Sequence, residues 1–176
     1  GIGNRGASVI RDLYATGAAN VISLCDVNLG AEKTTKSIKI HSSASQHKDF
    51  REMFDKMGDK IDAVSIATPD FSHFPITILA MSLGKHVYVE KPLTQTIFEG
   101  RTMVNVWKAS DRVVAVGLNR RGNEVYQKLA IEIRAGKIGQ VTTAWAARVS
   151  NMAPNGIGKL QAEQPPKDFN WDIAAP

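Results

Sequence analysis

Short apolar runs alternate with amphipathic stretches along most of the chain. The apolar runs predict strands at about 20–26, 63–67, 86–89 and 113–116. Apolar residues at helical spacing predict helices at about 4–16, 29–36, 48–57, 76–83, 94–109 and 124–134. Buried strands that alternate with helices of these lengths form βαβ units with right-handed crossovers. The pattern therefore predicts an α/β fold with a doubly wound parallel sheet.

The same spacing predicts which side chains face the core in two of these helices. In the helix at 48–57 the apolar positions are Phe50, Met53, Phe54 and Met57. In the helix at 94–109 the residues expected to face inward are Ile97, Val104 and Trp107.

The pattern changes after Gly139. Residues 140–149 are rich in β-branched and aromatic side chains, but no helix follows them, and 151–176 is rich in Asn, Gly, Pro and Gln without a sustained period. We therefore predict one domain over 1–139. Residues 140–176 are expected to be the first strand and a loop of a second, α+β domain that the chain does not complete.

Composition narrows the class of protein. The 176 residues are 43% hydrophobic, which is enough for a proper core. No apolar stretch approaches the ~18 residues of a membrane span, so we expect a soluble protein with no membrane partner. A signal peptide would lie upstream of Gly1, which leaves the cytoplasm and the periplasm both open.

The distribution of charge argues against a nucleic-acid-binding protein, and the spacing of His and Cys argues against a metal-binding one. The formal net charge of +5 comes from scattered Lys and Arg residues, as on a solvated surface, and predicts no nucleic-acid partner. The four histidines and the single cysteine, Cys25, lack the spacing of a zinc site, so no metal is predicted.

The strongest chemical signal is the opening segment, Gly1-Ile2-Gly3-Asn4-Arg5-Gly6, which is a complete G-x-G-x-x-G motif. The glycines of such a motif allow a tight turn, the approach of backbone amides to a pyrophosphate, and close packing of the following helix. Gly1, Gly3, Asn4, Arg5 and Gly6 are therefore candidate cofactor-binding residues. Arg5 either contacts the pyrophosphate or is solvated.

Asp26 follows Gly6 by twenty residues and ends the next apolar run. A carboxylate there would bind the adenine ribose hydroxyls and repel the extra phosphate of NADP, so NAD is predicted in preference to NADP. The alternatives are a plain glycine-rich helix entry and a strand-end turn carboxylate. The strand that normally precedes the first glycine is absent from the sequence, so we expect the chain as given to bind cofactor weakly and to turn over little substrate.

Candidate residues also follow the other predicted strands. Ligands of a doubly wound sheet bind beyond the carboxyl ends of its strands. Such ends carry Asp26, Thr68-Pro69, Glu90-Lys91-Pro92 and Asn119. Lys91 is the candidate catalytic residue, because an ammonium near a nicotinamide can stabilise negative charge as an alcohol loses its proton; the alternative is a surface lysine at a turn. Glu90 orients Lys91, holds the cofactor, or is a loop carboxylate.

Taken together, these segments resemble the amino-terminal half of the Gfo/Idh/MocA oxidoreductases over about residues 1–150. The resemblance is carried by Gly1–Gly6, Asp26, 61–64, 67–69, His73, 84–92 and 136–139, and the Glu90-Lys91-Pro92 segment is its most specific element. It implies a Rossmann NAD-binding domain in which Thr68, Pro69 and His73 lie at the cofactor. His73 is expected to begin a helix, where capping or packing is favoured over a role as a base. The resemblance also implies that Asn119 and Arg121 face the cofactor and substrate pocket, although Arg121 can equally be a surface residue.

The resemblance implies an NAD(P)-dependent enzyme that transfers a hydride between nicotinamide and a sugar, cyclitol or related polyol. It also implies a homo-oligomer for the full-length protein. The Asp-x-x-x-His of the family's second domain, whose histidine is the acid–base group, does not occur in this chain. Two alternatives remain: an NAD-dependent glycosidase of the same family, and a dinucleotide-binding regulatory protein without catalysis.

Overall fold

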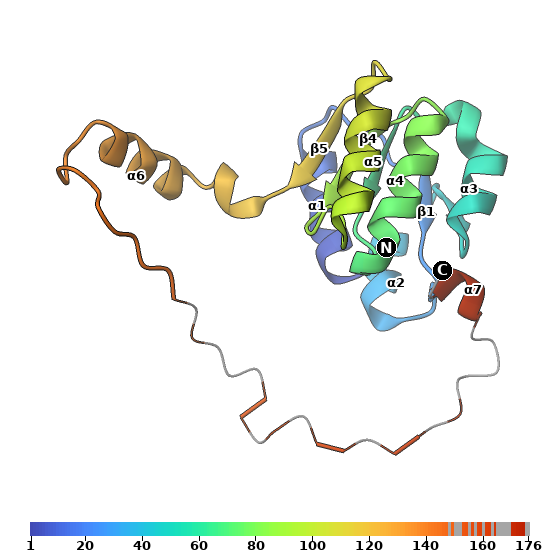
Figure 1. Cartoon of the computed structure of the whole chain (residues 1–176). Helices are drawn as coiled ribbons and strands as arrows, with labels where there is room; N and C mark the ends of the chain where they lie inside the picture. Colours follow the sequence, from blue (N-terminus) through green and yellow to red (C-terminus); the bar gives the residue numbers. More distant parts are fainter. Residues whose placement is uncertain are drawn as a thin grey trace. The chain divides into compact units, whose positions relative to one another are not determined.

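The computed structural model describes residues 1–147, 149, 153–154, 156, 158–159, 161–162, 164 and 170–174. The chain divides into two compact units (Figure 1). Unit 1 comprises Gly1–Leu118 and Asn170–Pro176, and unit 2 comprises Asn119–Phe169. The domain boundary predicted at residue 139 stays a prediction, because the contacts within this chain do not define the domains of the whole protein.

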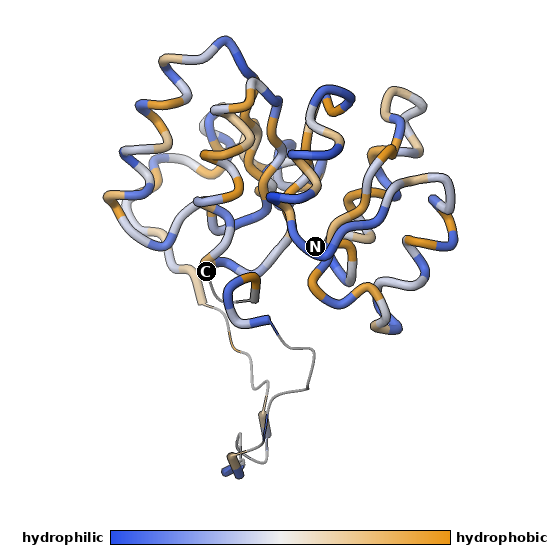
Figure 2. The backbone as a smooth tube through the Cα atoms, turned by 90° about the vertical axis from the view of Figure 1, so that its right-hand side faces the viewer, coloured by the Kyte–Doolittle hydropathy of each residue, from blue (hydrophilic) through white to orange (hydrophobic). Residues whose placement is uncertain are grey.

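Unit 1 alternates helices with short strands. Its helices are α1 (Asn4–Ala15), α2 (Glu32–Ile40), α3 (Phe50–Met57), α4 (His73–Ser82), α5 (Ile97–Lys108) and the short α7 (Trp171–Ala174), with 3-10 turns at Gly58–Lys60 and Asp70–Ser72. Its strands are β1 (Ser23–Cys25), β2 (Ser45–His47), β3 (Ala63–Ile66), β4 (His86–Glu90) and β5 (Val114–Gly117). Figure 2 shows the alternation of hydrophobic and hydrophilic residues along these elements.

All strand pairs of unit 1 are parallel. β1 pairs with β2, and β3, β4 and β5 form a second sheet in that order. The Gly1 amino group donates to the Cys25 carbonyl at 3.0 Å, and the Cα of Gly1 faces the backbone of Ala67 just beyond β3. Gly1 therefore lies between the two sheets. The predicted α/β architecture with parallel strands is confirmed.

The core of unit 1 lies between the β3–β4–β5 sheet and the helices that pack on it. α4 contacts β3, β4 and α5 (Figure 1). Ala80 of α4 and Val89 of β4 are completely buried. In α3, Met53 and Phe54 belong to the same core, as the helical spacing predicts. α1 contacts β3 and α2.

The inward face predicted for α5 is wrong. Ile97, Val104 and Trp107 are 86%, 38% and 45% exposed, whereas Met103 is buried and Val106 packs partly against the core. Apolar residues occur on every side of this helix, so their periodicity could not decide which side packs. A capping box between Thr96 and Glu99 fixes where α5 begins.

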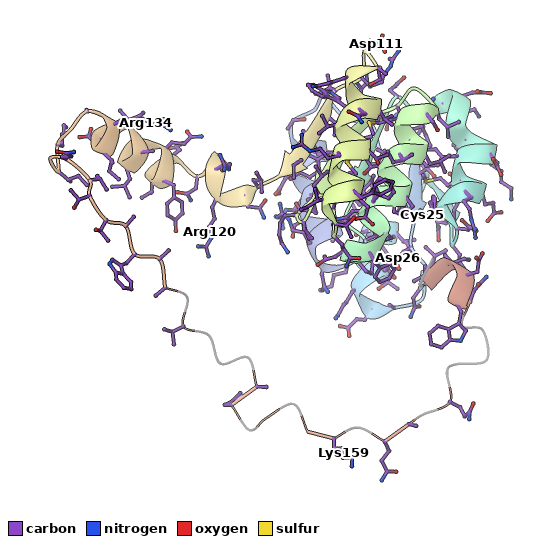
Figure 3. All side chains as sticks on the ribbon, viewed as in Figure 1. Cys25, Asp26, Asp111, Arg120, Arg134 and Lys159 are labelled. Atoms are coloured by element: carbon purple, nitrogen blue, oxygen red, sulfur yellow. The ribbon has the colours of Figure 1, made fainter. Side chains whose placement is uncertain are left out.

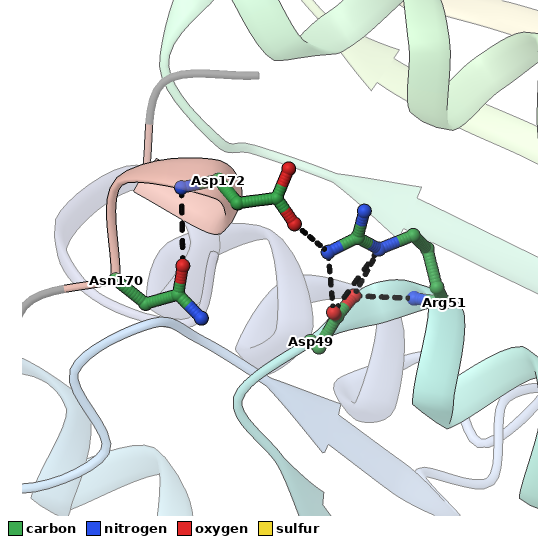
Figure 4. A network of polar contacts seen from close by, with 4 residues as sticks. All are labelled: Asp49, Arg51, Asn170 and Asp172. Carbon is green, nitrogen blue, oxygen red and sulfur yellow. Dashed lines mark hydrogen bonds and ion pairs between the residues drawn. The ribbon is translucent and has the colours of Figure 1, made fainter.

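α7 is attached to the beginning of α3 by an ion-pair network (Figure 4). Arg51 donates from Nη2 to Asp49 and to Asp172, each at 2.7 Å. These hydrogen bonds raise the pKa of Arg51, and the one from Arg51 holds the pKa of Asp49 below its usual value. Asp49 also caps α3 by accepting the Arg51 N–H.

Unit 2 contains a 3-10 turn at Asn119–Gly122 and helix α6 (Glu124–Arg134), whose bounds match the predicted helix. Arg120 precedes α6 and Arg134 ends it (Figure 3). The strand predicted over 140–149 is not observed at 140–147 or at Val149, and Arg148 lies outside the described residues. A strand needs a neighbour for its backbone hydrogen bonds, and the described part of this unit offers none. The loop predicted over 151–176 falls largely outside the described residues, and the second domain stays a prediction.

None of the helices that the structure describes is both long and apolar enough to cross a membrane. The described side chains also form no cluster of three or more His, Cys, Asp or Glu that could hold a metal ion.

Candidate functional site

The glycine loop leads directly into α1 and leaves the beginning of this helix without a cap. Gly3 is the N-cap residue and makes no side-chain capping hydrogen bond, and the first turn contains no acidic residue. Asn4 has φ of 43°, in the left-handed region that Asn tolerates better than most residues. A helix beginning of this kind is suited to an anion, because its N–H groups and dipole both favour negative charge.

Two glycines of the loop are required by close approach of backbone. A Cβ at Gly6 would lie 2.1 Å from the Gly1 carbonyl oxygen, and a Cβ at Gly1 would lie 2.4 Å from the Ala67 carbonyl oxygen. Neither backbone atom can move away cheaply. At Gly3 the nearest atom to such a Cβ would be Cβ of Lys33, at 3.3 Å, so this position is tight but tolerant. The loop is therefore pressed against the end of β3, as dinucleotide binding requires.

Asp26, which is labelled in Figure 3, follows β1 directly and is hydrogen-bonded to the glycine loop. Its Oδ2 accepts the Ile2 N–H at 2.9 Å, and its Oδ1 accepts the Asn28 N–H at 3.0 Å. A carboxylate oxygen can accept more than one hydrogen bond, so both oxygens keep capacity for hydroxyl donors. Asp26, the residue predicted to bind the adenine ribose, thus lies beside the glycine loop.

A second connection joins the glycine loop to the end of β4. Glu90 is only 4% exposed, and its Oε1 accepts from Arg5 Nε at 2.8 Å and from the Tyr88 hydroxyl at 3.2 Å. Gly117 of β5 is the register partner of Glu90. A Cβ at Gly117 would lie 2.6 Å from Glu90 Oε1 and 2.7 Å from the Tyr88 hydroxyl. The Glu90 carboxylate therefore occupies the space that a side chain at position 117 would need.

The charges in this cluster stabilise one another. The hydrogen bond to Glu90 raises the pKa of Arg5. Burial, followed by the charge of Glu90, raises the pKa of the Tyr88 hydroxyl, which therefore stays a donor at neutral pH. Nearby, burial raises the pKa of the Cys25 thiol to about 11, so Cys25 is not a nucleophile at neutral pH.

Lys91 lies next to Glu90 in sequence but is exposed, whereas Glu90 is buried. The Lys91-Pro92 peptide bond is cis. Within the described residues the Lys91 ammonium makes no hydrogen bond or ion pair. At the end of β4 one charged side chain is thus buried and the next one is exposed.

His73, Thr68 and Pro69 lie at the neighbouring strand end. The His73 ring is 1% exposed, with Nδ1 2.6 Å from the Pro92 carbonyl oxygen and Nε2 2.9 Å from the Thr68 carbonyl oxygen. Thr68 Oγ1 is buried and has no hydrogen-bond partner among the described residues. Pro69 is exposed. The structure gives His73 a packing role, and the predicted contacts of His73, Thr68 and Pro69 with a cofactor stay predictions.

Asn119 and Arg121 belong to unit 2, where both lie in the exposed 3-10 turn. The Arg121 carbonyl oxygen accepts from Gln127 Nε2 at 2.9 Å. Because both residues lie in unit 2, their predicted places in the cofactor and substrate pocket stay predictions.

The sequence reasoning did not include Tyr88 or Gly117 in the site. One signal for Tyr88 is present: it precedes Glu90 by two residues, and such residues share one face of a strand. The place of Gly117 opposite Glu90 depends on strand register and carries no local signal.

Comparison with known proteins decides the family. Residues 1–118 match the family model of the Gfo/Idh/MocA proteins, described as an oxidoreductase family with an NAD-binding Rossmann fold. The chain belongs to the Gfo/Idh/MocA oxidoreductase family. The predicted resemblance and the Rossmann fold class are thereby confirmed.

Three relatives illustrate the similarity to this family. Inositol 2-dehydrogenase of Salmonella typhimurium is 29% identical over 143 residues, which cover 80% of this chain and 41% of that protein. A glycosyl hydrolase family 109 protein of Solibacter usitatus is 30% identical over 159 residues, which cover 84% of this chain and 35% of that protein. The crystal structure of myo-inositol 2-dehydrogenase from Lactobacillus plantarum superposes with a TM-score of 0.71 at 25% identity, covering 80% of this chain and 41% of that one. The chain thus spans about two fifths of the Gfo/Idh/MocA dehydrogenases that it matches.

The residues present fit the dinucleotide that the Gfo/Idh/MocA family binds. Gly1 and Gly6 allow the loop to approach the sheet, and the uncapped beginning of α1 provides donors for a pyrophosphate. Asp26 provides acceptors for ribose hydroxyls, and the buried Thr68 hydroxyl has no partner in the part of the chain that the structure describes.

Proposed function

We propose that the whole protein is an NAD-dependent oxidoreductase that transfers a hydride between nicotinamide and a carbinol carbon of an inositol, sugar or related polyol. The observation that carries the proposal is the Arg5–Glu90 ion pair of 2.8 Å. It ties the glycine loop to the strand end that carries Lys91. The family match and the similarity to inositol dehydrogenases support the same function.

Each group has a distinct part in this proposal. The N–H groups that begin α1 bind the pyrophosphate, and Asp26 binds the adenine ribose. Bound NAD supplies the hydride acceptor. The Lys91 ammonium lies beside the substrate hydroxyl and stabilises the negative charge that develops as this hydroxyl loses its proton.

NAD is proposed over NADP because both Asp26 oxygens are held by backbone N–H groups, Oδ2 by Ile2 of the glycine loop and Oδ1 by Asn28. A fixed carboxylate there repels a 2′-phosphate and accepts from free ribose hydroxyls. We also propose a homo-oligomer for the full-length protein, which light scattering of the purified protein tests.

The decisive experiment compares Lys91→Met with the wild type in the full-length protein. NADH formation is followed with a panel of inositols and sugars, and NAD affinity is measured by calorimetry. We expect kcat to fall by about 10²- to 10⁴-fold while the Kd for NAD changes less than about threefold. The matched control is Lys60→Met, because Lys60 is also exposed but precedes β3 at the opposite end of the strands. Wild-type protein that binds no NAD, or a Lys91→Met variant with full activity, contradicts the proposal.

The second candidate is an NAD-dependent glycosidase, and it is favoured by one observation. The Solibacter relative described as a glycosyl hydrolase family 109 protein matches 84% of this chain. An aryl glycoside separates the two functions. Release of the aryl group without net NADH, by protein that retains NAD through purification, supports the glycosidase, whereas NADH accumulation with a free polyol supports the dehydrogenase.

A further inference from the structure

His73 connects the two strand ends at the centre of the site. It is the first residue of α4, and its ring lies between the Thr68 carbonyl beyond β3 and the Pro92 carbonyl beyond β4. The two distances are 2.9 Å and 2.6 Å, and the ring is 1% exposed. Both ends of the imidazole are thus engaged by backbone of different loops.

The chemistry of these contacts makes His73 difficult to replace. Carbonyl oxygens only accept hydrogen bonds, and a neutral imidazole carries one N–H, so the ring donates to one of the two carbonyls at a time unless both nitrogens carry a proton. A buried carbonyl without a donor costs roughly 1–3 kcal/mol. Pro92 has no N–H of its own and contributes only an acceptor to its turn. A flat ring with a nitrogen on each side spans the two loops, and its few rotatable bonds lose little entropy when it is fixed.

Lys91 lies between two anchored neighbours. On one side Glu90 is held by Arg5 and Tyr88, and on the other side the Pro92 carbonyl is held by His73. The Lys91 side chain itself has no hydrogen bond or ion pair in the described part of the chain. The place of its ammonium therefore depends on how firmly the backbone of its turn is held.

We propose that His73 is a positioning residue that holds the Lys91 turn in the orientation required for hydride transfer. This inference rests on the proposed role of Lys91 as the catalytic ammonium. His73 does not touch the substrate. It acts through its contact with the Pro92 carbonyl. Its contact with the Thr68 carbonyl fixes the position of the Lys91 turn relative to the end of β3.

The test uses a double-mutant cycle in the full-length protein. His73→Phe keeps a flat ring without donors, and we expect kcat to fall by about 10- to 100-fold with the Kd for NAD changed less than about threefold. His73→Gln keeps one donor and is expected to restore part of the rate. In a Lys91→Met background, His73→Phe should lower kcat by less than about twofold further, because the residue through which it acts is already absent. The control is His41→Phe, since His41 is similarly buried at 8% exposure but lies at the end of α2.

Two outcomes overturn the inference. One is a kcat of the double variant that falls by the product of the two single-variant factors. Such a result indicates that His73→Phe has a general structural effect that does not act through Lys91. The other concerns hydrogen exchange of the Glu90, Lys91 and Leu93 amides, which we expect to be about tenfold faster in His73→Phe and His73→Gln than in the wild type. Exchange as slow as in the wild type overturns the inference. The exchange measurement needs no activity, so it separates this inference from the proposed function, which fails if Lys91→Met alone is fully active. If His73→Phe does not fold, His73→Gln carries both measurements.

Discussion

Replacing Gly117 by alanine is expected to disturb the site through the side chains above it. The new Cβ would lie 2.6 Å from Glu90 Oε1, 2.7 Å from the Tyr88 hydroxyl and 2.8 Å from Glu90 Cδ. All three atoms belong to the far ends of side chains, which can rotate away without moving the sheet. The cost is therefore set by the interactions that those ends make.

The magnitude follows from the Arg5–Glu90 pair. A displaced Glu90 carboxylate loses the 2.8 Å hydrogen bond from Arg5 in an almost fully buried position. Hydrogen bonds to charged groups contribute about 1.5–3 kcal/mol. The Arg5 side chain is 42% exposed, so solvent screening reduces this value. We expect Gly117→Ala to lower the free energy of unfolding by about 1–2 kcal/mol.

Urea denaturation followed by circular dichroism measures this change. Gly58→Ala is the matched control, because Gly58 has helical φ and ψ of −51° and −45° and no neighbour within 4 Å of a new Cβ. It is expected to stabilise the protein by about 0.4–1 kcal/mol. If Gly117→Ala were as stable as the wild type, or if the control lost as much stability, the argument from the Glu90 contacts would be refuted.

Three other perturbations have defined outcomes. Gly6→Ala places a Cβ 2.1 Å from the Gly1 carbonyl oxygen, so calorimetry should detect no NAD binding. Urea denaturation should show a larger loss of unfolding free energy than for Gly117→Ala, about 3 kcal/mol or more. Asp26→Ser removes the charge that excludes a 2′-phosphate, and the ratio of the Kd values for NADP and NAD should fall by about tenfold or more in fluorescence titrations; an unchanged ratio would show that Asp26 does not select the cofactor. Burial raises the pKa of Cys25 from 9.0 to about 11, so the folded state holds this proton more tightly than the unfolded state. Stability should therefore fall by up to about 2.7 kcal/mol between pH 9 and pH 11, and urea titrations of Cys25→Ala should lack this part of the fall.

The elements that the sequence predicts best are those whose own residues define them. Helix α6 is bounded by Asn123, which caps it, and by Gly136 with φ of 78° beyond its end. The strands β3, β4 and β5 are short apolar runs. The glycine loop and Asp26 could also be predicted, because both are recognised from the spacing of residues within one short segment of the sequence.

The elements that escaped prediction depend on partners distant in sequence. β2 is Ser-Gln-His, which has no apolar run, and it forms a strand because β1 pairs with it in parallel. The buried side of α5 is chosen by the sheet and not by its own periodicity. The Arg5–Glu90 pair joins residues 85 positions apart, and no local pattern indicates such a contact.

The uncapped first turn of α1 has a practical consequence for work on this protein. A helix beginning with no side-chain cap and no acidic residue in its first turn attracts small oxyanions as well as dinucleotides. Ligands that bind only the folded state raise its apparent stability in proportion to the logarithm of their concentration. Phosphate and sulfate buffers will therefore inflate melting temperatures and compete in cofactor titrations, and zwitterionic amine buffers give the cleaner baseline.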